Sequence, residues 1–164
     1  MSNHDELCLP ESPRPAKAPG GPGRANLDYS FGLPGGAYCL GTARIAVGRV
    51  LAQHGLGDMV ELGVLATSEL LGNAVLFTPD RGVSLTLRWR FGVLRLTVFD
   101  EHPDHVGGDE KRCRAHRRHA LSTLQAVVDE CGGVLGLAPA EKPLAGSKLW
   151  VVIPRVAGKR YAEL

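Results

Sequence analysis

The sequence predicts an α+β two-layer sandwich, with a mostly antiparallel, mixed sheet that carries helices on one face. Two observations lead to this fold class. Apolar residues recur with helical spacing in three long segments, and they alternate with polar residues in several short ones. These segments follow one another as strand, two helices, hairpin, helix and hairpin, an order that favours helices packed on an antiparallel sheet.

The first three elements lie between residues 27 and 78. Residues 27–33 alternate apolar and polar side chains, which predicts an opening strand. Helical spacing over residues 37–54 predicts the first helix. The second helix should begin near Asp58, which could form a capping box with Glu61 three residues later, and should end at Thr78-Pro79.

The second half of the domain should contain two hairpins with a helix between them. A polar, glycine-rich loop is expected before that helix, and Gly132-Gly133 should end it. The expected elements are strands at 83–90 and 93–99, a loop at 101–112, a helix at 114–131, and strands at 134–137 and 148–153.

Length and composition are those of one domain with a tail at each end. The chain has 164 residues, of which 44% are hydrophobic, and a formal net charge of +2. Residues 1–26 are rich in proline and glycine, so we expect them to be disordered, followed by the domain at 27–156 and a C-terminal tail at 157–164. Four cysteines without framework spacing and the lack of a secretory leader indicate a cytoplasmic protein that does not bind membranes.

One short motif carries the strongest functional signal. Glu69 and Asn73 are four residues apart in a largely apolar helical segment, so their side chains share one helix face. A carboxylate can position water or accept a proton, and a carboxamide oxygen can bind Mg²⁺. A polar edge on a packed helix is the structural alternative for this pair.

The motif and its context resemble a known family. Residues 66–78 read Ala-Thr-Ser-Glu-Leu-Leu-Gly-Asn-Ala-Val-Leu-Phe-Thr, which resembles the N-box of the GHKL (histidine-kinase-like) ATPase superfamily. Two later landmarks keep the family order: Asp100 after an apolar strand, and Gly146-Ser147-Lys148-Leu149-Trp150 in the last strand. The chain is therefore similar to small actinobacterial regulators related to anti-sigma-factor serine kinases, which have the Bergerat-type ATP-binding fold.

The resemblance assigns roles to five residues. Glu69 would be the catalytic carboxylate that positions water or acts as a base, and Asn73 would bind the Mg²⁺ of Mg-ATP. Asp100 would accept a hydrogen bond from the adenine amine, while Ser147 and Lys148 would contact adenine or phosphate. A strand-end turn is the structural alternative for Asp100.

The sequence departs from the family where glycines usually approach the nucleotide. Glu101-His102-Pro103-Asp104 follows the expected adenine aspartate, and Arg117, Arg118 and His119 stand where a second glycine-rich box would offer its N–H groups to phosphate. Two interpretations remain. Either these three side chains bind the nucleotide instead, or the site is vestigial and the protein is a nucleotide-free interaction module.

The histidine-rich segment 102–119 suggests a further alternative. Cys113, His116 and His119 could form part of a zinc site that His102 or His105 completes, although the spacing matches no standard zinc finger. The arginines of this segment could also bind phosphate, but a broad basic face with exposed aromatic residues is not evident. We therefore do not expect direct binding to nucleic acid.

The resemblance implies a switch protein that acts on transcription through a protein partner. That partner would be a sigma factor, an anti-sigma antagonist or a DNA-binding regulator, with ATP and Mg²⁺ as candidate cofactors. Serine/threonine kinase activity is one option, against which the missing glycines argue. Homodimerisation is another, because such regulators often dimerise.

Overall fold

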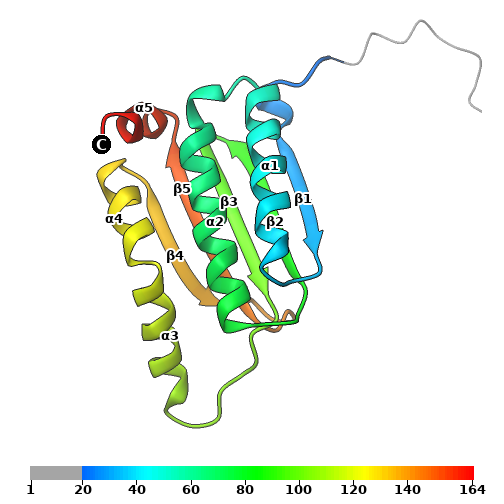
Figure 1. Ribbon diagram of the computed structural model, residues 1–164, viewed down its shortest axis with the longest axis vertical. Helices are drawn as coiled ribbons and strands as arrows, with labels where there is room; N and C mark the ends of the chain where they lie inside the picture. The colour runs from blue at the N-terminus through cyan, green and yellow to red at the C-terminus, as the bar shows by residue number, and fades with distance from the viewer. Residues whose placement is uncertain (1–19) are drawn as a thin grey trace, which may run out of the picture.

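The computed structural model describes residues 20–164, which form one α+β domain (Figure 1). The first strand and two long helices come first, two hairpins follow with a helical segment between them, and a short helix ends the chain. The elements are η1 (Arg24–Asn26), β1 (Asp28–Leu33), α1 (Tyr38–Gln53), η2 (Gly57–Met59), α2 (Val60–Phe77), β2 (Val83–Arg90), β3 (Val93–Asp100), α3 (Asp109–Ala120), α4 (Ser122–Glu130), β4 (Val134–Pro139), β5 (Ser147–Pro154) and α5 (Val156–Ala162).

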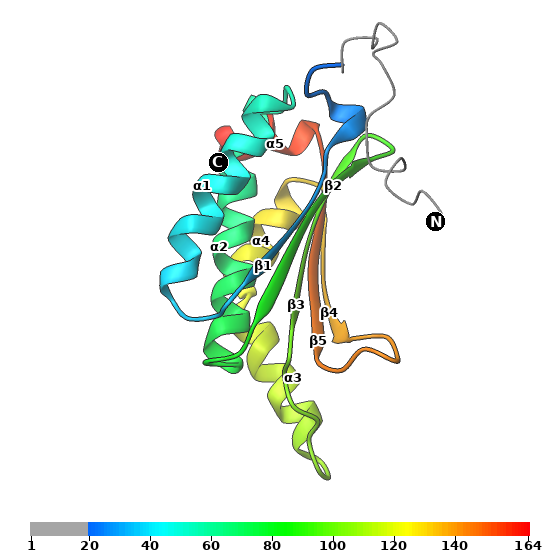
Figure 2. The same ribbon diagram turned by 90° about the vertical axis from the view of Figure 1, so that its right-hand side faces the viewer.

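The five strands form one sheet in the order β1-β2-β3-β5-β4. Helices pack on one face of this sheet, so the predicted two-layer α+β sandwich is confirmed (Figure 2). All neighbouring strands are antiparallel, which corrects the expectation of a mixed sheet. The reason is topological: β2–β3 and β4–β5 are hairpins, and β5 runs antiparallel to β3 as well as to β4.

The core lies between the sheet and the helices. Along β2, β3 and β5, alternate residues point toward the helices, and Leu85, Leu96 and Val151 are fully buried there. The segment Gly57–Phe77, with a mean hydropathy of 1.4, is the one helix of the described chain apolar enough to span a membrane. It includes α2, where one face with Leu62, Ala66, Leu70, Leu71 and Ala74 is fully buried, so its hydropathy is consistent with a core helix of a compact, soluble-type domain.

The segment after β3 differs from its prediction. A single helix was expected at 114–131, but α3 begins at Asp109 and a turn at Leu121 separates it from α4. Gly107 and Gly108 precede the helix, and Asp109 and Glu110 occupy its first turn, where carboxylates favour a helix start. These exposed polar residues carry no apolar periodicity, so the first helical turn left no pattern from which it could be predicted.

Two expectations at the ends of helices were wrong. Residues 157–164, expected to be a tail, contribute most of α5, whose Ala157 is fully buried in the core. Asp58 does not cap α2, which has no side-chain cap. Instead, Asp58 accepts a 3.1 Å hydrogen bond from the Nε of Arg155, which precedes α5. The long-range ion pair thus replaces the local capping box.

The predicted disorder of residues 1–26 concerns a segment that lies mostly outside the described residues. From residue 20 on, the chain leads into the short helix η1. Buried His54 accepts a 2.8 Å hydrogen bond from the hydroxyl of Tyr29 at Nε2, and its Nδ1 lies 2.7 Å from the carbonyl oxygen of Gly23. This histidine connects the end of α1 to the segment before β1.

Candidate functional site

The centre of the candidate site is a buried ion pair between α3 and the end of β3. Arg117 Nη2 donates a 2.6 Å hydrogen bond to Asp100 Oδ2, and the two side chains are 2% and 0% exposed. Asp100 faces the helices because it continues the inward alternation of β3. Two buried charges are stable at such a place only when they are paired and hydrogen-bonded.

Asn73 of α2 is the third member of this cluster. Its Oδ1 accepts a 2.9 Å hydrogen bond from Arg117 Nε, and its Nδ2 donates a 3.0 Å bond to the backbone oxygen of Arg117. The carboxamide therefore binds both the side chain and the main chain of one arginine. The Oδ1 atom that the resemblance assigns to Mg²⁺ is occupied by Arg117.

Asp100 is further held by two backbone N–H groups. Its Oδ1 accepts hydrogen bonds from His102 N at 3.1 Å and from Ser147 N at 3.2 Å. The start of β5 approaches so closely because Gly146 has φ +102, and a Cβ there would collide with the backbone oxygen of Asp100. The carboxylate thus joins β3, β5 and α3.

The guanidinium of Arg117 is not fully satisfied. Its Nη1 is the one buried side-chain nitrogen or oxygen without a hydrogen-bond partner among residues 20–164. The aromatic ring of Phe77 lies below the cation, 5.5 Å from its central carbon, and provides a cation–π contact. Arg117 is therefore a fixed, tightly enclosed cation rather than a solvent-facing phosphate ligand.

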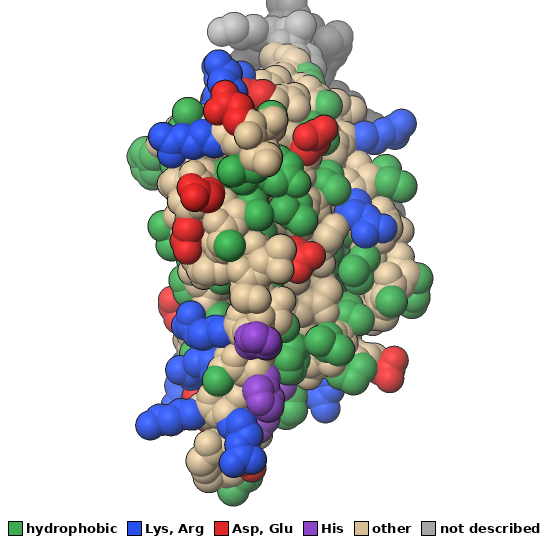
Figure 3. Space-filling view, turned by 60° about the vertical axis from the view of Figure 1, so that its left-hand side comes forward, with side chains coloured by type: hydrophobic (Ala, Val, Ile, Leu, Met, Phe, Trp, Pro, Cys, Tyr) green, Lys and Arg blue, Asp and Glu red, His purple; other side chains and the backbone are tan. Residues whose placement is uncertain are grey.

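A pocket of about 370 Å³ lies beside this cluster, between the loop after β3, α3 and the β4–β5 hairpin. Its wall includes His102, His105, Cys113, Arg117 and Ser147. Basic side chains and histidines gather at the α3 end of the molecule (Figure 3). The pocket thus combines a buried cation with groups typical of metal ligands.

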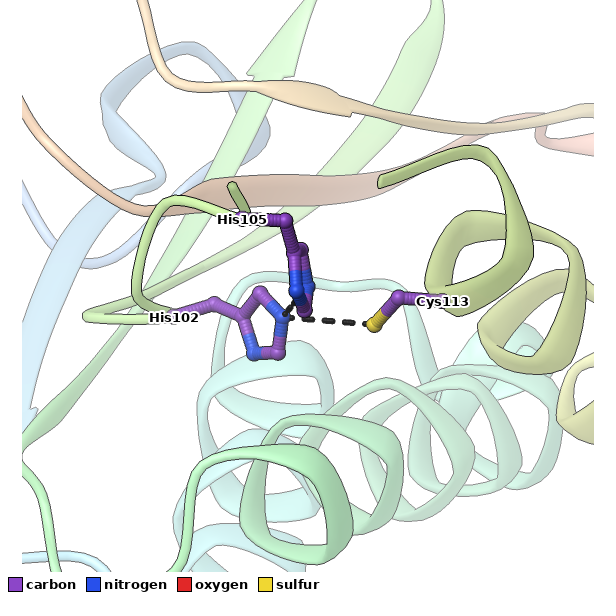
Figure 4. A group of neighbouring side chains, drawn as sticks. All are labelled: His102, His105 and Cys113. Carbon is purple, nitrogen blue, oxygen red and sulfur yellow. Dashed lines mark hydrogen bonds between the residues drawn. The ribbon is translucent and has the colours of Figure 1, made fainter. Parts of the chain in front are cut away.

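Three neighbouring side chains in that wall converge on one point (Figure 4). His102 Nε2 lies 2.9 Å from His105 Nε2 and 3.3 Å from the sulfur of Cys113. The other ring nitrogen of His102, Nδ1, lies 3.1 Å from the backbone oxygen of Phe77. Burial, and then the nearby positive charge of Arg117, lower the pKa of His102, so this imidazole is neutral near pH 7.

The structure brings some of the predicted site residues together and separates others. Asn73, Asp100, Arg117 and the backbone of Ser147 form the cluster. Glu69 lies one turn before Asn73 on α2, half-buried, and its carboxylate makes no hydrogen bond or ion pair within residues 20–164. The expected catalytic carboxylate therefore does not take part in the cluster.

The remaining three predicted residues lie away from the cluster. Arg118 is exposed and donates a 3.2 Å hydrogen bond to the backbone oxygen of Leu137, and His119 is exposed. Lys148 lies on the opposite face of the sheet, where its Nζ is 5.9 Å from the ring centre of Phe99 and 5.4 Å from that of Trp150. That lysine cannot contact a ligand beside Asp100 without crossing the sheet.

The face of the sheet away from the helices forms a second, broader candidate surface. No helix of the described chain covers it (Figure 2). Alternate residues of β2, β3 and β5 place cations and aromatic rings there, with a shallow hollow between them. The open sheet face, as we name it, consists of Thr86, Arg88, Arg90, Val93, Arg95, Thr97, Phe99, Lys148, Trp150 and Val152.

Positive charge dominates the open sheet face. Arg88 and Arg95 are direct cross-strand partners, an arrangement that brings like charges together. Asp28 forms ion pairs with Arg88 at 2.9 Å and with Arg90 at 3.2 Å, but Arg95 has no ion pair within the described residues. The alternation in β2 indicates a polar sheet face, but the sequence does not show that Lys148 and Trp150 of β5 belong to the same surface, because the fold sets the order of the strands.

Neither a protein-family model nor a curated protein matches this sequence. The function of the chain must therefore be inferred from its fold and from the geometry of the site.

Proposed function

We propose that this protein is a nucleotide-independent regulatory module that acts by binding a protein partner. One observation carries the proposal: Arg117 fills the space between Asn73 and Asp100, the two residues that the family resemblance assigns to Mg²⁺ and adenine. Both of their ligand atoms are already used by a side chain of the same chain. The interpretation of a vestigial nucleotide site is thus favoured over that of a working one.

The energetic cost of opening this site opposes nucleotide binding. A ligand that replaced Arg117 would have to separate a buried ion pair, and breaking such a pair costs about 3–5 kcal/mol. A cost of that size weakens affinity by roughly 10²- to 10³-fold, since each 1.4 kcal/mol corresponds to a factor of ten. In addition, no glycine turn is present at residues 117–121 to bring backbone N–H groups to phosphate.

Kinase chemistry has less support than nucleotide binding. Glu69 would have to activate a partner hydroxyl, but it does not line the pocket beside Arg117. We therefore place no catalytic step in this protein. An ATP-gated regulator is the second candidate function, and one observation favours it: the pocket of about 370 Å³ adjoins Arg117, so a nucleotide could approach the pair from that side.

The open sheet face suggests the chemistry of the partner. Four cations, Arg88, Arg90, Arg95 and Lys148, face one carboxylate, Asp28, among the described residues. An acidic protein surface would relieve the repulsion between Arg88 and Arg95, and Phe99 and Trp150 would add apolar contact area. We propose a transcription-regulating protein with an acidic patch as the partner, in the cytoplasm, where free Cys39, Cys113 and Cys131 would stay reduced.

Calorimetric titration with Mg-ATP tests whether Arg117 blocks the nucleotide site. We expect no binding tighter than about 1 mM to the wild-type protein, and no thermal stabilisation by the nucleotide. Micromolar binding that is lost in Asp100→Asn would contradict the proposal and support the ATP-gated regulator. GTP serves as the matched control ligand, because a site that reads the adenine amine would reject it.

The partner surface needs a separate test. The partner can be captured by cross-linking to the wild-type chain. Capture should be lost with the double variant Arg88→Glu, Arg95→Glu and kept with Arg49→Glu, which changes an exposed arginine on α1. The captured protein should itself carry an acidic patch at the cross-linked site. Equal capture by both variants, or binding of single-stranded oligonucleotides by the same face, would count against an acidic protein partner.

A further inference from the structure

We propose that His102, His105 and Cys113 form a zinc site, with a fourth coordination position open to the adjoining pocket. The two histidines lie in the loop between β3 and α3, and the cysteine lies in the second turn of α3. All three ligand atoms lie within 4.8 Å of one another (Figure 4). Two imidazoles and one thiolate with an open position form a ligand set that zinc accepts in proteins.

The distances between the ligand atoms are those of a nearly formed site. A tetrahedral zinc ion with Zn–N bonds of about 2.05 Å and Zn–S bonds of about 2.3 Å separates two nitrogens by roughly 3.3 Å and nitrogen from sulfur by roughly 3.5 Å. The corresponding distances are 2.9 Å from His102 Nε2 to His105 Nε2 and 3.3 Å from His102 Nε2 to Cys113 Sγ. These two separations are a few tenths of an ångström shorter than the zinc geometry requires, and His105 Nε2 and Cys113 Sγ lie within 4.8 Å of each other.

The hydrogen bonds around His102 fix which nitrogen is free to bind metal. Nδ1 faces the backbone oxygen of Phe77 at 3.1 Å, which can only accept, so Nδ1 carries the proton and Nε2 has the lone pair. A carbonyl that holds the second nitrogen of a histidine in this way is the usual support of a metal ligand. Without an ion, His105 Nε2 and Cys113 Sγ both approach the single lone pair of His102 Nε2. That lone pair accepts one good hydrogen bond and not two, so one of the two contacts is poorly satisfied.

This ligand set differs from the one that spacing suggests. His116 and His119 are exposed on α3, and neither belongs to the cluster. The loop folds back instead, so that His102 and His105 reach Cys113 across the space beside the pocket. The ligands are thus set by tertiary structure rather than by a repeat along one helix.

The neighbouring charges are compatible with a dication. Arg117 is already paired with Asp100, and Arg114 forms an ion pair with Glu110 one turn earlier on α3. Asp104 lines the same pocket and adds negative charge near the open position. Cys113 would bind as a thiolate and release its proton to solvent, which lowers the net charge of the occupied site to about +1.

A bound ion would connect the loop after β3 to the helix that carries Arg117. His102 also donates its backbone N–H to Asp100, so the metal ligands and the buried ion pair share one residue. Zinc at this place would therefore stabilise α3 in the position in which Arg117 reaches Asn73 and Asp100.

The test is metal titration of the full-length protein after removal of metals with a chelator. We expect one equivalent of Zn²⁺ to bind, and one equivalent of Co²⁺ to give visible ligand-field bands with a thiolate-to-cobalt charge-transfer band. The charge-transfer band should disappear in Cys113→Ser. Zinc affinity, measured by competition with a chromogenic chelator, should fall by at least about tenfold in His102→Ala and in His105→Ala.

Three matched variants separate this site from other donors. Cys131→Ser removes a buried thiol, His116→Ala removes an exposed histidine of α3, and Cys8→Ser removes a thiol outside the described residues. All three should bind zinc as the wild-type protein does. The proposal is overturned if no charge-transfer band forms, if the band persists in Cys113→Ser, or if it depends on Cys8. Circular dichroism of each metal-free variant shows whether its fold is intact. In the wild-type protein, bound zinc should protect Cys113 from alkylation, which gives a measurement that needs no variant.

Discussion

Arg117 and Asp100 form a 2.6 Å ion pair with almost no exposure to solvent, although they are seventeen positions apart in the sequence, with a loop and most of a helix between them. The pair connects α3 to the end of β3, and Asn73 holds the arginine from α2. These three elements meet at no other buried polar cluster of the described chain. The arginine therefore decides both how α3 docks and what the candidate nucleotide site can hold.

Removing Arg117 should destabilise the fold strongly. In Arg117→Met, the carboxylate of Asp100 stays buried without its partner, so we expect the free energy of unfolding to fall by about 3–5 kcal/mol. Urea unfolding measures this loss. The double variant with Asp100→Asn should recover a large part of it, because the amide carries no charge but still accepts from the N–H groups of His102 and Ser147.

A partly exposed ion pair gives the matched control for that variant. Arg155 and Asp58 are 3.1 Å apart with side chains 43% and 29% exposed, so Arg155→Met should cost less than about 1 kcal/mol. A cost for Arg117→Met no larger than that for Arg155→Met would show that the buried pair does not organise the site.

Gly136 should be required for the position of Trp150 on the open sheet face. The two residues are cross-strand partners, and a Cβ at Gly136 would overlap the indole ring. We expect Gly136→Ala to displace the ring, to cost about 1–3 kcal/mol, and to change tryptophan fluorescence. Gly32→Ala on β1 is the control, since nothing lies within 4 Å of its Cβ position. Similar effects in both variants would argue against this packing role.

Gly146 should be needed for close packing as well as for its backbone angle. Gly146→Ala must accept φ +102 and also a collision with the backbone of Asp100, so the N–H of Ser147 should lose its bond to Asp100. Gly92→Ala, with φ +77 and open space, isolates the cost of the angle, which is about 1–2 kcal/mol. Hydrogen exchange at Ser147 should accelerate in the first variant only. Unchanged exchange there would contradict the packing argument.

Cys131 should react slowly with alkylating reagents while the fold is intact. Burial raises the pKa of this thiol, so the reactive thiolate is scarcer at a given pH than in a free cysteine. Mass spectrometry after brief treatment with iodoacetamide should find half-buried Cys113 modified before Cys131, and zinc should slow only Cys113. Fast labelling of native Cys131 would show that its surroundings open readily.

Local patterns were sufficient for most of the fold. Alternation placed β1 and the two hairpins, and helical spacing placed α1 and α2, because these elements bury one face against a common core. The start of α3 and the presence of α5 were not visible, since polar helices and short ones leave little periodicity. Asp58 shows the same limit: a capping box looked favourable locally, but Arg155, almost a hundred residues later, binds that carboxylate instead.

The candidate site shows most clearly which features follow from local sequence patterns and which depend on contacts between distant residues. Periodicity along the chain is enough to place Asn73 on one helix face and Asp100 at the end of an apolar strand. The position of Arg117 between them, and the convergence of His102, His105 and Cys113, arise only in the folded chain. Such contacts depend on how a loop folds back and on which buried charges must be paired. Long-range geometry decides how the loop folds back, and desolvation decides which buried charges must be paired. Neither effect produces a periodic pattern in the sequence.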